Sequence, residues 1–453
     1  MLDFANMTLD ELIREGGYEC ECGRRHDAGL KYLKIGRGAV QFIPEGLAAI
    51  GVTRPFVVCD VNTRAAAWDS VQAQLRSAGI PYVLHCFAQA HLEPDEHAVG
   101  ELCMAYDPAC DGVLAIGSGV INDCCKVLAH AVRRPQMIVG TAPSMDGYAS
   151  NSSSMIRSRC KVTMPNACPG AIIADTMIMK DAPDRLLWAG LGDMLAKYSA
   201  LCEWRIAHVV CGEYYCEAVA ALMRRSLRTI VASAPRLMER DPEVIGAVAE
   251  GLILSGIAMA YAQVSRPASG MEHYFSHLWE MFALDRGQPT ELHGIQVGVG
   301  TFLTFGVYDR LRRITPDRET AEKAMREFDP AAWEARVRRV FGKAAQTLID
   351  KEYTAWRKND PALHAQRLDR ILDGWGEITR AMDEELPPAK EIIALMKKQG
   401  MPVVPADLGQ SEQDAYDAFI CMRDTRDKYL LTSLLWDLGL LEDFPLTLSA
   451  DEA

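Results

Sequence analysis

Short apolar, β-branched segments alternate with helical segments between about residues 35 and 180, and this alternation restricts the possible folds most strongly. Four apolar segments are predicted strands: PFVVCD (55–60), PYVLHC (81–86), GVLAIG (112–117) and QMIVGT (136–141). The segments between them, such as NTRAAAWDSVQAQLRSAG (62–79), have the composition of helices. Buried strands connected by helices pair in parallel, so this part is predicted to be an α/β domain with a parallel sheet and flanking helices.

The character of the sequence changes after residue 182. Long helical patterns begin with PDRLLWAGLGDMLAKYSALCEWRIAH (183–208), and no alternating strand pattern returns. The segments after residue 306 are charged and amphipathic, which is typical of the solvated faces of packed helices. We therefore predict two domains, an α/β domain at residues 1–182 and an all-α domain at residues 183–453.

Charge and cysteine usage restrict the class of partner and the compartment. The net charge is −13, which weighs against nucleic acid or an anionic membrane as the main partner. The acidic N-terminus does not resemble a signal peptide, and the apolar segment 244–262 carries Glu250 near its middle, so a buried core helix is expected there instead of a membrane span. The fourteen cysteines are scattered, as in a cytoplasmic protein with reduced thiols.

Only the segment CECGRRH (20–26) has closely spaced metal-binding residue types. It offers Cys20, Cys22 and His26, whereas a closed zinc site takes four ligands. A metal knuckle and a polar hairpin both remain open for this segment.

A glycine turn follows the third predicted strand directly. Gly117, Ser118 and Gly119 stand between GVLAIG and a helix, where backbone N–H groups and the helix dipole can bind a phosphate. Asn122 occupies the position of the third glycine of the common dinucleotide fingerprint, so a simple tight turn is the alternative.

Two further polar features belong to the same predicted domain. Asp60 ends a strand and could accept hydrogen bonds from an adenosine ribose, or could cap the helix that follows. The segment TAPSMDGYASNSS (141–153), which contains Asp146, is either a ligand loop at the carboxyl end of a strand or a solvated loop.

The second half of the chain contains a possible metal site. His273 and His277 are four residues apart on one predicted helical face, His293 follows a loop, and Asp193 is expected at the start of a helix after two glycines. One carboxylate and two imidazoles can hold a divalent metal and leave positions open for a substrate. The alternative for each histidine is a buried polar residue with a hydrogen-bond partner.

Five motifs in this order resemble those of the sn-glycerol-1-phosphate dehydrogenases, in their longer bacterial form. The motifs are GSGVIND (117–123), TAPSMDGYAS (141–150), GLGDMLAK (190–197), SRPASGMEHYFSH (265–277) and HGIQVGVG (293–300). These enzymes belong with the iron-type alcohol dehydrogenases, glycerol dehydrogenases and dehydroquinate synthases. The resemblance covers about residues 30–305.

The resemblance implies an N-terminal domain that binds NAD or NADP and a helical domain that binds metal and substrate. It assigns the cofactor to Gly117, Ser118, Gly119, Val120, Ile121, Thr141, Ala142, Pro143, Ser144 and Ser150. Asp60 is a further candidate, from its place at the end of a predicted strand. The resemblance assigns one divalent metal to Asp193, His273 and His293. Nickel or zinc is expected, and iron is the alternative. The resemblance also implies catalytic and substrate-binding roles for Asp146, Asp193 and His277.

The implied reaction interconverts dihydroxyacetone phosphate, a small phosphorylated triose, and sn-glycerol 1-phosphate in a homodimer. Arg266 is a candidate for the substrate phosphate, with an ion pair as its alternative role. Two other functions stay open: a polyol dehydrogenase or dehydroquinate synthase-like enzyme on the same scaffold, and a dinucleotide- or metal-binding sensor without activity.

Overall fold

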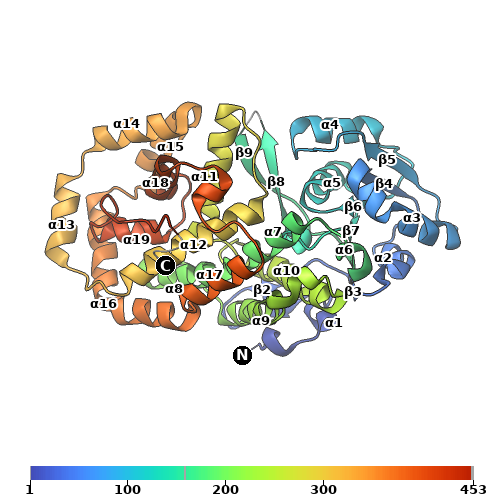
Figure 1. The fold of residues 1–453 in the computed structure, drawn as a ribbon, viewed down its shortest axis with the longest axis horizontal. Coiled ribbons are helices and arrows are strands. Elements are labelled where there is room, and N and C mark those ends of the chain that lie inside the picture. Colours follow the sequence, from blue (N-terminus) through green and yellow to red (C-terminus); the bar gives the residue numbers. More distant parts are fainter. Residues whose placement is uncertain (1, 158–159, 450–453) are drawn as a thin grey trace. The chain divides into compact units, whose positions relative to one another are not determined.

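The computed structural model describes residues 2–157 and 160–449 (Figure 1). The chain forms two compact units that interleave along the sequence. The first unit contains Met1–Leu195, Cys216–Ala268 and Ala283–Ile295, and the second contains Ala196–Tyr215, Ser269–Phe282 and Gln296–Ala453. Because the units interleave, they do not test the predicted domain boundary between residues 182 and 183.

A six-stranded parallel sheet forms the centre of the first unit. Its strand order is β3-β10-β7-β6-β4-β5, and every neighbouring pair is parallel. The strands are β3 (Tyr32–Gly36), β4 (Pro55–Asp60), β5 (Val83–Phe87), β6 (Gly112–Gly117), β7 (Gln136–Gly140) and β10 (Ala171–Asp175). The four predicted strands and their parallel pairing are confirmed. The sequence analysis missed β3 and β10. Only short helices within 39–49 separate β3 from β4, and a 3-10 helix at Gly147–Ala149 and two strands separate β7 from β10, so no long helical segment marks either crossover.

Helices cover the sheet because both faces of a parallel sheet are apolar. The helices of this unit are α1 (Leu9–Leu12), α2 (Ile43–Ala49), α3 (Val61–Ser77), α4 (Glu96–Ala105), α5 (Gly119–Val132), α6 (Thr176–Met179), α7 (Asp184–Leu195), α9 (Glu217–Ser233) and α10 (Pro242–Ala262). Alternate strand residues such as Val57, Leu114 and Val139 form one core with side chains of α2 and α3. Helix α5 directly follows β6 in the chain and packs along it.

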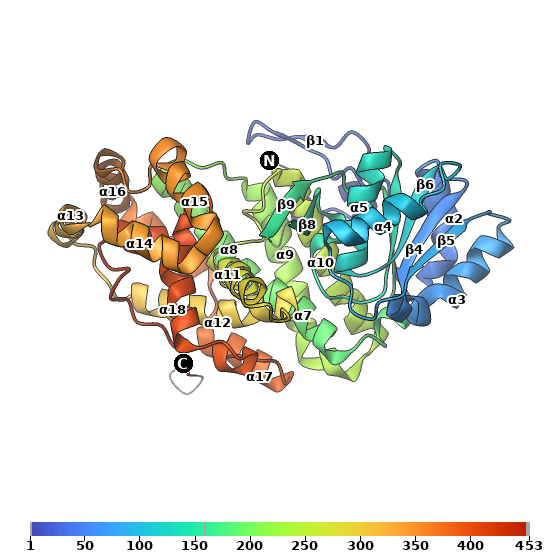
Figure 2. The same cartoon turned by 90° about the horizontal axis from the view of Figure 1, so that it is seen from above.

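Two hairpins complete the first unit. Strands β8 (Ser152–Arg157) and β9 (Cys160–Pro165) pair antiparallel, and β8 lies beside α4 and α5 (Figure 2). Strands β1 (Tyr18–Glu19) and β2 (Arg25–His26) pair across the segment CECGRRH, which is therefore a hairpin. A hairpin was one of the two alternatives left open for CECGRRH, whereas the pairing of β8 with β9 was not predicted.

Helix α10 is the apolar helix that raised the question of a membrane span. It has 21 residues and is long and apolar enough to cross a membrane, yet 78% of its most apolar window is buried within the protein. It packs against α9, α7 and α6 of the same unit, which agrees with the predicted core helix.

The second unit is helical. Its helices are α8 (Lys197–Cys211), α13 (Arg318–Glu327), α14 (Pro330–Phe341), α15 (Ala345–Lys351), α16 (Pro361–Glu385), α17 (Ala389–Lys398), α18 (Glu412–Cys421) and α19 (Leu431–Asp437), together with parts of α11 (Met271–Arg286) and α12 (His293–Leu311). Residues 176–449 are all described and contain no strand, so the predicted change to helical structure is confirmed. The helix predicted at 183–208 is divided into α7 and α8 at Ala196.

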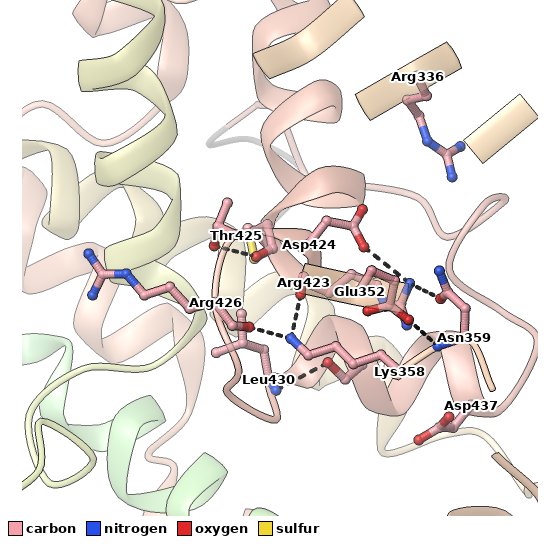
Figure 3. A network of polar contacts seen from close by, with 12 residues as sticks. Arg336, Glu352, Lys358, Asn359, Arg423, Asp424, Thr425, Arg426, Leu430 and Asp437 are labelled. Atoms are coloured by element: carbon pink, nitrogen blue, oxygen red, sulfur yellow. Dashed lines mark hydrogen bonds and ion pairs between the residues drawn. The ribbon is translucent and has the colours of Figure 1, made fainter. Parts of the chain in front are cut away.

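A buried polar network fixes the C-terminal part of this unit (Figure 3). The ammonium group of Lys358 donates hydrogen bonds to the carbonyl oxygens of Arg423 (2.6 Å), Arg426 and Lys428 (3.3 Å). Its burial lowers the pKa of Lys358 to about 8. Lys428 in turn donates to the carbonyl of Ser269, two residues before α11. The network therefore holds the segment RDTRDKYLL (423–431) against the start of the helix that carries His273 and His277.

Candidate active site

The glycine turn and the loop after β7 lie together at the carboxyl end of the sheet. Gly117 pairs with Gly140 at the ends of β6 and β7, and the Thr141 N–H donates to the Gly117 carbonyl at 3.0 Å. The hydroxyls of Ser118 and Ser144 are hydrogen-bonded to each other. The structure thus brings together the two segments that were predicted to bind the cofactor, at the edge where open α/β sheets bind ligands.

The two glycines of the turn are needed for different reasons. A Cβ atom on Gly117 would lie 2.6 Å from the Cβ of Ile121, so the protein itself requires glycine there. A Cβ on Gly119 would meet only Met145, at an ordinary 3.5 Å, and Gly119 has no positive φ. The fold therefore does not require glycine at position 119. A ligand that approaches the first N–H groups of α5 closely would require it, because a side chain there would occupy the ligand's space.

The remaining predicted cofactor residues are mostly buried and support the two loops. Ile121 packs on Gly117, and the Ala142 carbonyl accepts a 2.5 Å hydrogen bond from the Tyr148 hydroxyl. The Pro143 carbonyl lies against α7, since a Cβ on Gly190 would come within 1.9 Å of its oxygen. Val120 lies in the first turn of α5.

Two residues of α5 that the sequence analysis did not select hold the loop that contains Ser150. Lys126 is 1% exposed and donates to Gly147 O (2.7 Å), Ser150 Oγ (3.0 Å) and Ser152 O (3.0 Å). The Asn122 side-chain amide donates to the same Gly147 carbonyl at 3.1 Å. Asn122 thus replaces the third fingerprint glycine with a residue that supports the loop, a long-range role that has no local sequence signal.

We expect Gly119→Val to weaken NADH binding severely and leave the fold intact. The valine Cβ fits the protein, but its methyl groups would occupy the space that a pyrophosphate needs above the N-terminus of α5. Titration of NADH fluorescence and a thermal melt measure the two effects. Gly100→Val in α4 is the control, because a Cβ there meets no atom within 4 Å. Unchanged NADH affinity in Gly119→Val would make the turn a purely structural feature.

Asp60 caps α3. Its Oδ1 accepts from the N–H groups of Asn62 and Thr63, both at 2.8 Å, and Thr63 completes a capping box. The capping alternative is therefore present in the structure, and both bonds go to a single carboxylate oxygen. A ribose contact of Asp60 stays a prediction.

Asp193 and Asp146 are linked within the first unit. Asp193 Oδ2 accepts from the Asp146 N–H at 2.9 Å, and Asp146 Oδ2 accepts from the Ser255 hydroxyl of α10 at 2.9 Å. Asp193 lies near the end of α7, so its predicted position at the start of a helix is wrong. The glycines before it do not begin the helix; Gly190 lies within it, where its lack of a side chain lets α7 contact the Pro143 carbonyl.

His293 begins α12, and the next residue, Gly294, lies against α7 within the first unit. A Cβ on Gly294 would lie 2.0 Å from the Ala189 carbonyl oxygen, so the two backbones are in direct contact. Ala189 precedes Asp193 by one helical turn on the same face of α7. The glycine of the His-Gly pair therefore has a packing role beside the predicted ligand.

His273 is oriented by a buried carboxylate in the second unit. Its Nδ1 lies 2.9 Å from Glu272 Oε1, and the Ser199 hydroxyl donates to Glu272 Oε2 at 2.7 Å. Burial opposes ionisation of Glu272, but the hydrogen bonds from His273, Ser199 and the Gly270 N–H hold its pKa below the ordinary value. A carboxylate can only accept, so Nδ1 donates, and in the neutral imidazole Nε2 then keeps its lone pair, as in a metal-ligating histidine.

His277 lies one turn after His273 on α11. Its side chain is 21% exposed, its Nδ1 is 3.9 Å from Glu280 Oε2, and its ring meets the Tyr274 ring edge to face. Arg266 is 4% exposed in the first unit. The roles of His277 and Arg266 toward a substrate stay predictions.

The donor set fits a divalent transition metal. One carboxylate and two imidazoles suit zinc, nickel and ferrous iron, and the tautomer that Glu272 imposes on His273 is the one a metal ligand needs. Glu272 was not selected from the sequence, although its place next to His273 was a possible signal. The assignment of Asp193, His273 and His293 as ligands stays a prediction.

Comparisons with known proteins agree on one family. The family model for iron-containing alcohol dehydrogenase matches residues 34–183. The chain is 35% identical over 295 residues to the glycerol-1-phosphate dehydrogenase [NAD(P)+] of Halalkalibacterium halodurans, covering 64% of this chain and 74% of that protein. It is 33% identical over 334 residues to the enzyme of the same name from Geobacillus stearothermophilus, covering 73% and 82%.

Solved structures share the fold at low sequence identity. A 1,3-propanediol oxidoreductase superposes with a TM-score of 0.58 at 16% identity, covering 88% of this chain and 94% of that one. A probable glycerol dehydrogenase from Sinorhizobium meliloti superposes with a TM-score of 0.57 at 15% identity, covering 91% and 96%. The parallel sheet and the helical C-terminal region agree with this fold, and the two enzymes from Halalkalibacterium halodurans and Geobacillus stearothermophilus show that the chain is an NAD(P)-dependent dehydrogenase of the glycerol-1-phosphate dehydrogenase family.

Proposed function

We propose that this protein reduces dihydroxyacetone phosphate to sn-glycerol 1-phosphate with NADH or NADPH, and catalyses the reverse reaction, with one bound divalent metal. The observation that carries the proposal is the match to the glycerol-1-phosphate dehydrogenase [NAD(P)+] of Halalkalibacterium halodurans, which covers 74% of that protein. The turn at Gly117–Gly119, whose second glycine the fold does not itself require, supports the cofactor half. We further propose that the enzyme works in the cytoplasm as a homodimer.

We assign the metal to Asp193, His273 and His293. When bound, a divalent metal polarises the ketone oxygen of the substrate and stabilises negative charge on it, while the nicotinamide supplies the hydride. This donor set suits nickel, zinc and ferrous iron alike, and the resemblance to the bacterial glycerol-1-phosphate dehydrogenases is the reason for proposing nickel or zinc first. Glu272 contributes by holding His273 with Nε2 directed away from the hydrogen bond.

We assign the proton transfer and substrate contacts to the neighbouring polar groups. His277, at the next turn of α11, delivers a proton to the substrate oxygen directly or through water. Asp146 accepts from Ser255 through Oδ2, so its carboxylate is held in one orientation for a substrate hydroxyl. Asp60 favours NAD through the ribose, and Arg266 is proposed to bind the substrate phosphate.

The test is a direct comparison of substrates with the metal content known. We expect oxidation of NADH with dihydroxyacetone phosphate to far exceed that with unphosphorylated dihydroxyacetone, and the product to be the sn-1 phosphate. Elemental analysis of the same preparation identifies the metal. Equal rates with both ketones would replace the proposal by a polyol dehydrogenase, and an enzyme that binds NADH but turns over neither would favour a sensor.

A further inference from the structure

The hairpin CECGRRH acquires a fourth metal-ligating residue from a distant part of the chain. Cys20, Cys22, His26 and Cys216 of the first unit each offer a ligand atom, and these four atoms all lie within 4.8 Å of one another. Cys216 is 190 residues away from His26 in sequence and immediately precedes α9. The hairpin alone has too few ligands for a closed site, and the fold supplies the missing one.

Three of the six distances between the ligand atoms match those of a tetrahedral zinc site, and the other three are within 4.8 Å. Zinc bonds of about 2.3 Å to sulfur and 2.0–2.1 Å to nitrogen place two sulfur ligands about 3.8 Å apart, and a sulfur and a nitrogen about 3.5 Å apart. Cys20 Sγ and Cys216 Sγ are 3.8 Å apart. His26 Nε2 lies 3.4 Å from Cys22 Sγ and 3.6 Å from Cys216 Sγ.

The imidazole of His26 presents the correct nitrogen. Its Nδ1 lies 2.8 Å from the Tyr261 carbonyl oxygen, which can only accept, so Nδ1 carries a hydrogen and, in the neutral ring, Nε2 has its lone pair available beside the three thiols. The ring is fully buried and lies against the rings of Phe4 and Tyr261. Its orientation is thus fixed by packing and by a hydrogen bond to the backbone, as at many histidine ligands of metals.

The backbone around the cysteines is arranged as a tight turn. Cys20 N donates to Arg24 O at 3.1 Å, and Gly23 N donates to Cys20 O at 3.0 Å. Gly23 has a φ of +83°, which only glycine adopts without strain. Arg24 donates to the carbonyl of Ala262 at the end of α10, 2.6 Å away, so the turn is held against the helical part of the unit.

We propose that Cys20, Cys22, His26 and Cys216 bind a structural zinc ion that fastens the N-terminal hairpin to the start of α9. Four protein ligands fill the tetrahedral coordination of zinc and leave no position for a substrate, so this metal takes no part in the redox reaction. It is separate from the metal of the proposed active site, and neither proposal depends on the other. A disulfide between Cys20 and Cys216 would use two of the four groups and would give His26 Nε2 and Cys22 no role.

Zinc analysis of cysteine variants tests the proposal. The tag-free protein, purified under reducing conditions, is expected to contain one zinc ion per chain in addition to the active-site metal, and Cys22→Ser and Cys216→Ser should each lose this additional ion. Cys103→Ser is the matched control, because Cys103 is an exposed thiol outside this cluster and should leave the zinc content unchanged. The melting temperature should fall in Cys22→Ser and Cys216→Ser and stay the same in the control, since metal binding contributes to folding.

A measurement on the unaltered protein keeps the test decisive if the variants fail to fold. X-ray absorption at the zinc edge is expected to show sulfur neighbours at about 2.3 Å, which the aspartate and histidines of the proposed active site cannot supply. Zinc with only nitrogen and oxygen neighbours, no zinc at all, or a Cys20–Cys216 disulfide in the mass spectrum of the reduced preparation would each overturn the proposal. So would a zinc content unaffected by Cys22→Ser in a folded variant.

Discussion

His273→Asn is expected to abolish turnover of dihydroxyacetone phosphate together with the metal of the active site. The imidazole Nε2 is lost, and removing one of three protein ligands weakens metal binding severely. Asparagine is preferable to alanine because its amide can still donate to Glu272, whose carboxylate is fully buried and would otherwise lose the hydrogen bond at 2.9 Å. The fold should therefore survive, which a thermal melt checks.

Metal content and activity are measured on the same preparation. We expect His273→Asn to lose the active-site metal, keep the zinc of the cysteine cluster, and still bind NADH. His91→Asn is the control, since His91 is exposed and belongs to no metal cluster among the described residues. A folded His273→Asn protein with the full metal content of the unaltered enzyme would show that His273 is not a ligand.

His277→Ala is expected to lower kcat by about 10²–10⁴-fold with dihydroxyacetone phosphate saturating, the range for a positioned proton donor. Both the metal and NADH should still bind, because His277 is assigned to neither. The pH dependence of kcat should also lose the limb that reports this group. Separate measurements of kcat and KM distinguish this role from substrate binding alone, which would change mainly KM.

A structural role for His277 predicts a different pattern. Its ring packs edge to face on Tyr274, so removal of a merely structural histidine would lower the melting temperature and reduce every property together. His277→Gln, which keeps a polar side chain of similar length, serves as the second variant. Normal kcat in either variant, or loss of the metal along with the fold in both, would contradict the assignment.

Local sequence patterns were sufficient for the elements that one short segment encodes. The strands β4 and β6 are continuous apolar runs bounded by turn residues, and their identification needed no knowledge of the neighbouring strands. The turn at Gly117–Gly119 is also local, because the strand, the turn and the helix follow one another directly in the sequence. The change from α/β to helical structure is likewise visible as a change in the period of the apolar residues.

Contacts between distant segments were beyond such patterns. Nothing near CECGRRH indicates Cys216, 196 residues after Cys20. Nothing in GSGVINDCCK (117–126) indicates that Asn122 and Lys126 hold the loop at Gly147. The glycines before Asp193 suggested a helix start, yet Gly190 is a contact point with the Pro143 carbonyl inside a helix. In each case the role of the residue depends on the atom that packing places opposite it. That atom belongs to a distant segment and cannot be identified from the local sequence.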